Sequence, residues 1–142
     1  ASLLEKHLQY QKLQSEDPFV KEYMDWLGHH EFGLGQKPFV FEGQDPPQGD
    51  KSDIDYWLQI WIQYYEKVLS LETKNLLLVD YESFCAEPGV LVQQIGQQFG
   101  ASAESLNLKP YLNKRKPDAY PDSPFREKAE AIYQELLVKR DK

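Results

Sequence analysis

The chain has 142 residues, of which 41% are hydrophobic and 27% charged, and its formal net charge is −7 at neutral pH. This length predicts one domain, spanning 1–142, and is too short for two. The acidic balance argues against binding to nucleic acid or to an anionic membrane, because such surfaces attract basic proteins. No apolar run is long enough to cross a bilayer. The single cysteine, Cys85, excludes an internal disulfide framework and favours a reducing compartment such as the cytoplasm.

Two helices are predicted near the start of the chain. Residues 2–13 place Leu4 and Leu8 at helical spacing, which predicts an amphipathic helix. Asp17 and Pro18 are a typical N-cap and first-turn residue for a second helix, which ends near Gly28. The apolar residues of that second helix predict a wide buried face: Phe19, Val20, Tyr23, Met24, Trp26 and Leu27. Residues 31–50 mix glycine, proline and aromatic residues and are predicted to form an ordered, irregular loop.

The strongest helical pattern follows Ser52 and Asp53, either of which can cap a helix. Apolar residues recur at helical spacing from Ile54 to Val68 and predict a core helix. We expect its large aromatic side chains to lie in the core: Trp57, Trp61, Tyr64 and Tyr65.

Residues 76–79 (LLLV) form an unbroken apolar run that leads into a helical pattern. A short run that is apolar on both faces indicates a strand of a parallel sheet. A lone strand cannot satisfy its own backbone, and no second segment of similar strength is present, so we expect an exposed edge through which a homo-oligomer could form. The chain begins with alanine, and we therefore interpret it as part of a larger domain.

The rest of the chain is predicted to be a turn, two helices and a loop. The turn covers residues 80–86, and a helix then begins at Pro88 and stops at Gly100. Residues 107–122 form a loop, and Ser123 with Pro124 begins the last helix. The predicted fold class is therefore mainly α, with about five helices and one short strand of the parallel type.

The order of these elements resembles the C-terminal part of sulfotransferases that use 3′-phosphoadenosine 5′-phosphosulfate. In that family a tryptophan-bearing helix, here with Trp57 and Trp61, leads into a strand that ends in Tyr-Glu, here LLLVDYE at 76–82. The segments SLLEKH at 2–7 and DPFVKEYMDWLGHHEFG at 17–33 resemble earlier parts of bacterial members. The resemblance covers nearly the whole chain but only the second half of the family domain, which has a P-loop-like α/β fold.

The resemblance implies transfer of a sulfuryl group from 3′-phosphoadenosine 5′-phosphosulfate to a hydroxyl or amine of a small molecule or glycan. Ser2 would be the serine of the family's 3′-phosphate motif, and Lys114, Arg115 and Lys116 would form a basic loop that reaches a phosphate. The phosphosulfate-binding loop and the catalytic base would lie before the start of this chain. We therefore expect no catalytic residue within it, and no sulfate transfer by these 142 residues alone.

Each of these residues also has a structural interpretation. Ser2 is a good N-cap for the first helix, and the basic residues at 114–116 suit a solvated loop. His29 and His30 are adjacent, without a second ligand pair at metal-binding spacing, so no metal site is predicted. The alternative functions are a helical protein-interaction module without catalysis, and a module that binds the nucleotide without transferring sulfate.

Overall fold

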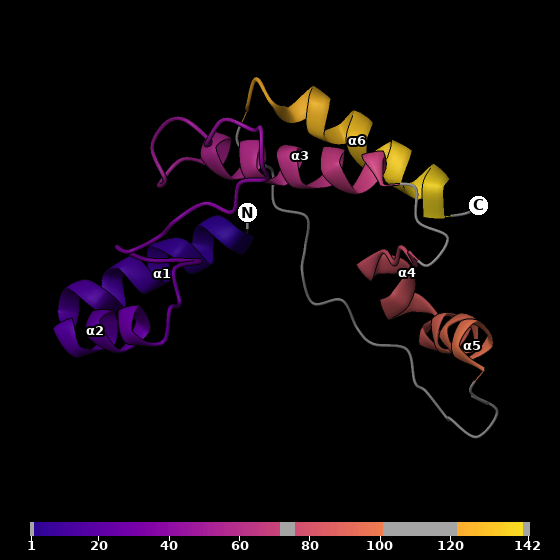
Figure 1. Ribbon diagram of the computed structural model, residues 1–142, viewed down its shortest axis with the longest axis horizontal. Coiled ribbons are helices and arrows are strands. Elements are labelled where there is room, and N and C mark those ends of the chain that lie inside the picture. The colour runs from indigo at the N-terminus through magenta and orange to yellow at the C-terminus, as the bar shows by residue number, and fades with distance from the viewer. Residues whose placement is uncertain (1, 72–75, 101–121, 141–142) are drawn as a thin grey trace. The chain divides into compact units, whose positions relative to one another are not determined.

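The computed structural model describes residues 2–71, 76–100 and 122–140. This part of the chain contains six helices and no strand: α1 (Ser2–Glu16), α2 (Pro18–Trp26), α3 (Ile54–Ser70), α4 (Tyr81–Ala86), α5 (Pro88–Phe99) and α6 (Arg126–Arg140) (Figure 1). The prediction of a mainly α chain is confirmed. None of the described helices combines the length and apolar character needed to cross a bilayer.

The chain divides into two compact units. The first unit consists of Ala1–Glu72 and Tyr120–Gln134 and holds α1, α2, α3 and the first part of α6. The second consists of Thr73–Ala119 and Glu135–Lys142 and holds α4, α5 and the last part of α6. Whether 1–142 behaves as one domain stays a prediction, and each unit is described separately below.

The predicted helix boundaries are confirmed where a capping residue marks them. The Asp17 carboxylate accepts a hydrogen bond from the Phe19 amide at 3.0 Å, and the Asp53 carboxylate accepts one from the Asp55 amide at 3.1 Å. These bonds satisfy backbone N–H groups that have no partner inside the helix. Gly100 ends α5 with φ of 67°, a left-handed conformation that favours glycine.

The strand predicted at residues 76–79 is wrong. These residues are irregular, and Leu76 and Val79 are exposed. A strand exists only where a neighbour accepts and donates its backbone hydrogen bonds, and the described residues supply no such neighbour. The homo-oligomer expected through a strand edge stays a prediction.

The turn predicted at residues 80–86 is a helix instead. Asp80 precedes α4 as its N-cap, and its carboxylate accepts a hydrogen bond from the Ser83 amide at 2.8 Å. The buried thiol of Cys85 lies on this helix. The aspartate cap therefore decides the local structure, although α4 is too short to show a helical pattern in the sequence.

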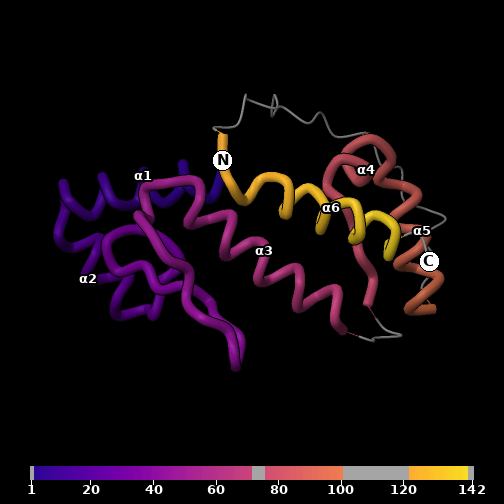
Figure 2. The backbone as a smooth tube through the Cα atoms, turned by 90° about the horizontal axis from the view of Figure 1, so that it is seen from above, coloured from indigo at the N-terminus to yellow at the C-terminus, as the bar shows by residue number. Residues whose placement is uncertain are grey.

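The wide buried face predicted for α2 is also wrong. No residue of α2 is buried, and the side chains of Phe19 and Trp26 are 67% and 79% exposed. The rings of Phe19, Tyr23 and Trp26 form a row on the helix surface, with centroids 5.9 and 6.2 Å apart. The reason is that α2 packs against α1 alone among the described helices (Figure 2), so one side of its apolar surface has no helix to cover it.

Helix α1 buries polar residues rather than the leucines that its sequence pattern predicts. Leu3, Leu8 and Leu13 are exposed, whereas His7 and Gln14 are buried. The two buried side chains face the backbone of the loop after α2, whose N–H groups need hydrogen-bond acceptors. The buried face of α1 is therefore defined by hydrogen bonding.

Helix α3 provides most of the buried apolar residues of the first unit. Ile54, Tyr56, Trp57 and Ile62 are buried. The Trp57 ring lies 5.1 Å from that of His7 and 5.9 Å from that of Phe32, between centroids. The core prediction is confirmed for Trp57, but Trp61 and Tyr65 are half-buried and Tyr64 is exposed.

The loop at 31–50 is irregular, as predicted, and glutamine side chains of α3 hold it. The Gln59 side chain accepts a hydrogen bond from the Gln48 amide at 3.1 Å and donates one to the Gln48 carbonyl at 2.8 Å. One helical turn later, Gln63 donates to the Asp45 carbonyl at 2.9 Å. These bonds satisfy loop backbone groups that secondary structure does not pair.

Candidate functional site

Three helices begin around one hollow in the first unit. The hollow has a volume of about 410 Å³. Its lining residues come from the starts of α1 and α6 and from the first two turns of α3, and they are Ser2, Leu3, Ile54, Trp57, Leu58, Trp61, Ser123, Arg126, Ala129, Glu130 and Tyr133. Figure 1 shows these three helix starts near one another. We call this space the helix-start hollow.

The electrostatics of the helix-start hollow favour an anion. Each helix start carries partial positive charge from backbone N–H groups, and Arg126 adds a full positive charge at the first residue of α6. The Arg126 side chain is exposed and forms no ion pair with any described residue. Glu130 lines the same space and opposes an anion, so the binding position must lie toward Ser2 and Arg126.

The apolar part of the hollow is aromatic. Trp57 is buried, and its indole N–H donates a hydrogen bond to the Lys51 carbonyl at 2.8 Å. Because this bond uses its one polar group, Trp57 offers only ring surface to the hollow. Trp61 and Tyr133 add further ring surface. The hollow therefore combines a position for an anion with surfaces on which a planar ring can stack.

The structure places one of the predicted site residues in this hollow. Ser2 is the first residue of α1 and contributes to the wall of the hollow, a position that suits an anion ligand. Lys114, Arg115 and Lys116 lie outside the described residues, and their role stays a prediction. Ser123 and Arg126 were not predicted as site residues. In the sequence these two residues belong to the segment Ser-Pro-Phe-Arg at the start of a helix. This segment predicts a helix cap but does not predict a ligand.

The second unit has its own hollow, of about 720 Å³, lined by residues 77–80, by α4 and α5 and by Arg140. The Arg140 guanidinium forms an ion pair with the Asp80 carboxylate and lies 3.3 Å from the Ser83 hydroxyl. Burial raises the pKa of Asp80, but hydrogen bonds from Ser83 and Arg140 outweigh burial and lower its pKa below the ordinary value of 3.8. The Asp80–Arg140 pair thus holds the end of α6 to the start of α4.

Replacing Asp80 by asparagine tests this pairing, since asparagine can still cap α4 but carries no charge. We expect the variant to lower the free energy of unfolding by about 1 kcal/mol at neutral pH, because the ion pair is partly exposed. A carboxyl whose pKa is lowered by folding stabilises the fold above its unfolded pKa and loses that contribution as the pH falls through the folded pKa. Urea unfolding near pH 7 and near pH 3 should therefore show a smaller difference between variant and wild type at the acidic pH.

Asp122→Asn, at an exposed position, is the control. A difference that does not change with pH contradicts the pairing.

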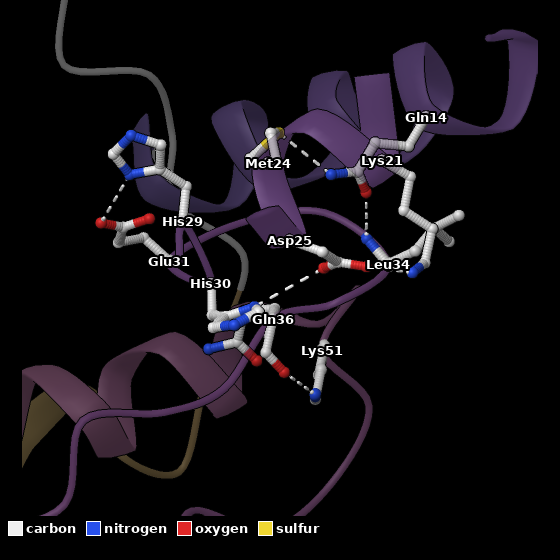
Figure 3. Close-up of polar contacts among 10 residues, drawn as sticks. All are labelled: Gln14, Lys21, Met24, Asp25, His29, His30, Glu31, Leu34, Gln36 and Lys51. Carbon is white, nitrogen blue, oxygen red and sulfur yellow. Dashed lines mark hydrogen bonds and ion pairs between the residues drawn. The ribbon is translucent and has the colours of Figure 1, made fainter. Parts of the chain in front are cut away.

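The adjacent histidines do not form a metal site. His29 Nδ1 lies 3.6 Å from the Glu31 carboxylate, and His30 Nδ1 lies 3.7 Å from that of Asp25 (Figure 3). Within residues 2–71, 76–100 and 122–140, no group of three or more histidine, cysteine, aspartate or glutamate side chains could hold a metal ion.

The helix-start hollow is therefore the best candidate site on geometric grounds: three helix starts, one free cation and aromatic walls. Comparison of the chain with protein-family models, with curated proteins and with solved structures found no match.

Proposed function

We propose that this chain provides the scaffold and part of the 3′-phosphate site of a sulfotransferase, which transfers a sulfuryl group from 3′-phosphoadenosine 5′-phosphosulfate to a hydroxyl or amine acceptor. The observation that carries the proposal is the meeting of Ser2, Arg126 and three helix starts around one hollow. The family resemblance implies that Ser2 binds the 3′-phosphate of the cofactor.

A phosphate fits the polar end of the hollow. The Ser2 hydroxyl can donate one hydrogen bond to a phosphate oxygen, and the guanidinium of Arg126 can donate two in parallel. Charge-assisted hydrogen bonds of this kind contribute about 1.5–3 kcal/mol each before the entropy of association is subtracted. The aromatic walls supply the surface on which an adenine ring stacks.

Several finer features belong to the same proposal. The P-loop-like α/β fold, a cytoplasmic location and an acceptor of the small-molecule or glycan class follow from the resemblance, and the described residues contribute only helices to such a fold.

Titration of the chain with adenosine 3′,5′-bisphosphate, followed by NMR, tests the proposal. We expect binding at about millimolar affinity, with the largest shift changes at the amides of Ser2 and Leu3 and at the start of α6. Ser2→Ala should weaken binding by roughly tenfold, the loss that follows when one charge-assisted hydrogen bond is removed, and Arg126→Gln, which removes two, should weaken it by more.

Lys128→Gln is the matched control, since Lys128 lies on the same helix but pairs with Glu66 at 2.8 Å and does not line the hollow. Its affinity for the bisphosphate should be unchanged. Adenosine without phosphates should bind much more weakly than the bisphosphate. Equal binding of the two ligands, or no effect of Arg126→Gln, would show that the hollow does not recognise a phosphate.

A helical protein-interaction module remains the second candidate, and the exposed surface of α2 favours it. Phe19, Tyr23 and Trp26 form a continuous row of exposed aromatic side chains. Aromatic surfaces of this kind are common at protein interfaces. If the bisphosphate does not bind and Trp26→Ala abolishes a protein association of the full chain, the second candidate replaces the first.

A further inference from the structure

His7 is a fully buried histidine that holds a loop to helix α1. Its exposed fraction is 0%. Its Nδ1 atom accepts a hydrogen bond from the Gly33 amide at a donor–acceptor distance of 3.2 Å. The Trp57 ring packs against the imidazole, with 5.1 Å between ring centroids. One titratable nitrogen therefore pairs directly with a buried backbone group of another segment.

The loop segment that His7 holds is fastened at further points. We call residues 32–36 the latch segment. The Leu34 amide donates to the Gln14 side chain at 2.6 Å, and Gln14 also contacts Met24 (Figure 3). At the far end, the Gln36 side chain accepts from the Tyr56 hydroxyl at 2.9 Å and the Gln36 carbonyl accepts from Lys51 at 2.5 Å. Of the bonds from α1, only the one from His7 depends on a group that titrates near neutral pH.

Protonation of His7 acts on the atom that forms this bond. Because Nδ1 accepts the Gly33 N–H, the neutral ring carries its proton on Nε2. A second proton must then bind to Nδ1, where it faces the Gly33 N–H and removes the acceptor. The Nε2 atom is buried and has no hydrogen-bond partner within the described residues, so no carboxylate there stabilises the imidazolium.

Burial of His7 and one of the two charges near it disfavour the imidazolium. Burial lowers its pKa from the ordinary value of 6.5, because the imidazolium loses water, and the Lys51 ammonium lowers the pKa further. Asp50, on the same loop, raises the pKa and offsets part of this effect. The Trp57 ring, which packs against the imidazole from α3, does not titrate.

We propose that His7 and the Gly33 amide form a pH-sensitive latch, in which protonation of Nδ1 breaks the bond between His7 and Gly33 while the Gln14–Leu34 bond still holds the latch segment to α1. The latch does not depend on the proposed cofactor site, because His7 does not line the helix-start hollow. Release would free the part of the loop that packs against Trp57, a residue that also lines that hollow.

The test follows the amides of Gly33 and Leu34 and the imidazole of His7 by NMR of the full chain, from about pH 8 to about pH 5, where histidine titrates. We expect the Gly33 amide to shift with the same midpoint as the His7 ring, below 6.5. The opening of the Gly33 amide, measured by hydrogen exchange and corrected for the intrinsic pH effect, should increase about tenfold for each unit by which the pH falls toward that midpoint, because the protonated fraction of His7 increases by this factor. The Leu34 amide, bound to an uncharged amide, should change much less.

His7→Asn is the decisive variant, because its side-chain oxygen can accept the Gly33 N–H but does not titrate. It should abolish the transition, whereas His29→Asn, at an exposed histidine, should leave it unchanged. The latch is refuted if the Gly33 amide stays fixed while His7 titrates, or if the transition persists in His7→Asn. It is also refuted if His7 titrates at or above 6.5, or if the chain unfolds globally before His7 gains a proton.

Discussion

Replacing Trp57 by alanine is expected to lower the free energy of unfolding by about 3–5 kcal/mol, the range for removing a large aromatic side chain from a packed core. Trp57 is only 6% exposed. Its ring contacts His7 from α1 and Phe32 from the loop, and its indole N–H donates to the Lys51 carbonyl. The substitution therefore leaves a cavity where three segments meet and an unpaired carbonyl beside it. Chemical denaturation followed by circular dichroism measures the loss.

Trp26→Ala is the matched control for this prediction. Trp26 is 79% exposed, and its ring contact is with Tyr23, which is itself exposed. Its replacement should change the free energy of unfolding by less than about 1 kcal/mol, as is usual at exposed positions. Similar losses for the two tryptophans would mean that Trp57 is not the centre of the first unit, or that α2 is covered by a partner.

Replacing Gly33 by alanine should lower the free energy of unfolding by about 2–5 kcal/mol. Gly33 has φ of 81°, where a side chain costs about 1–2 kcal/mol. A Cβ atom there would also lie 2.3 Å from the Gln14 side-chain oxygen. Gln14 is buried and bound to Leu34 and Met24, so it cannot move without losing these contacts, at a further cost of about 1–3 kcal/mol. Thermal or urea unfolding of the purified variant measures the sum.

Gly43→Ala separates the two costs. Gly43 has the same φ of 81°, but no atom lies within 4 Å of a Cβ built there. It should therefore show the backbone cost alone. In a Gln14→Ala background the cost of Gly33→Ala should fall to that of Gly43→Ala, because the clash is gone. If Gly33→Ala and Gly43→Ala cost the same in the wild-type background, Gln14 does not restrict Gly33.

Helix positions follow directly from the local sequence. Asp17 with Pro18, Asp53, and Gly100 are residues whose own chemistry satisfies or ends a helix, so the bounds of α2, α3 and α5 could be predicted within a few residues. Helix α4 could not be predicted in this way. Its cap, Asp80, was present, but a helix of six residues cannot show a periodic pattern.

The sequence alone could not show which faces are buried, because burial depends on what lies opposite. The aromatic row of α2 and the leucines of α1 follow apolar patterns typical of core faces, yet the aromatic row and Leu3, Leu8 and Leu13 are exposed and Leu4 is only half-buried. The buried residues of α1 are His7 and Gln14, which face unpaired backbone N–H groups of a distant loop. In the same way, Leu76 and Val79 have the composition of a strand, but a strand also requires a neighbouring chain segment.

The residues of the candidate site also differ in whether the sequence or the structure identified them. Ser2 was selected from the sequence by resemblance, whereas Arg126 and Ser123 became site residues only because the start of α6 lies beside the starts of α1 and α3. By itself the sequence determined the positions of the capped helices, because capping and helix periodicity are short-range effects that a few neighbouring residues settle. Only the tertiary structure decided which polar groups are buried, where the hollows lie and which helix starts meet. These depend on contacts between residues far apart in the chain, for which no local pattern exists.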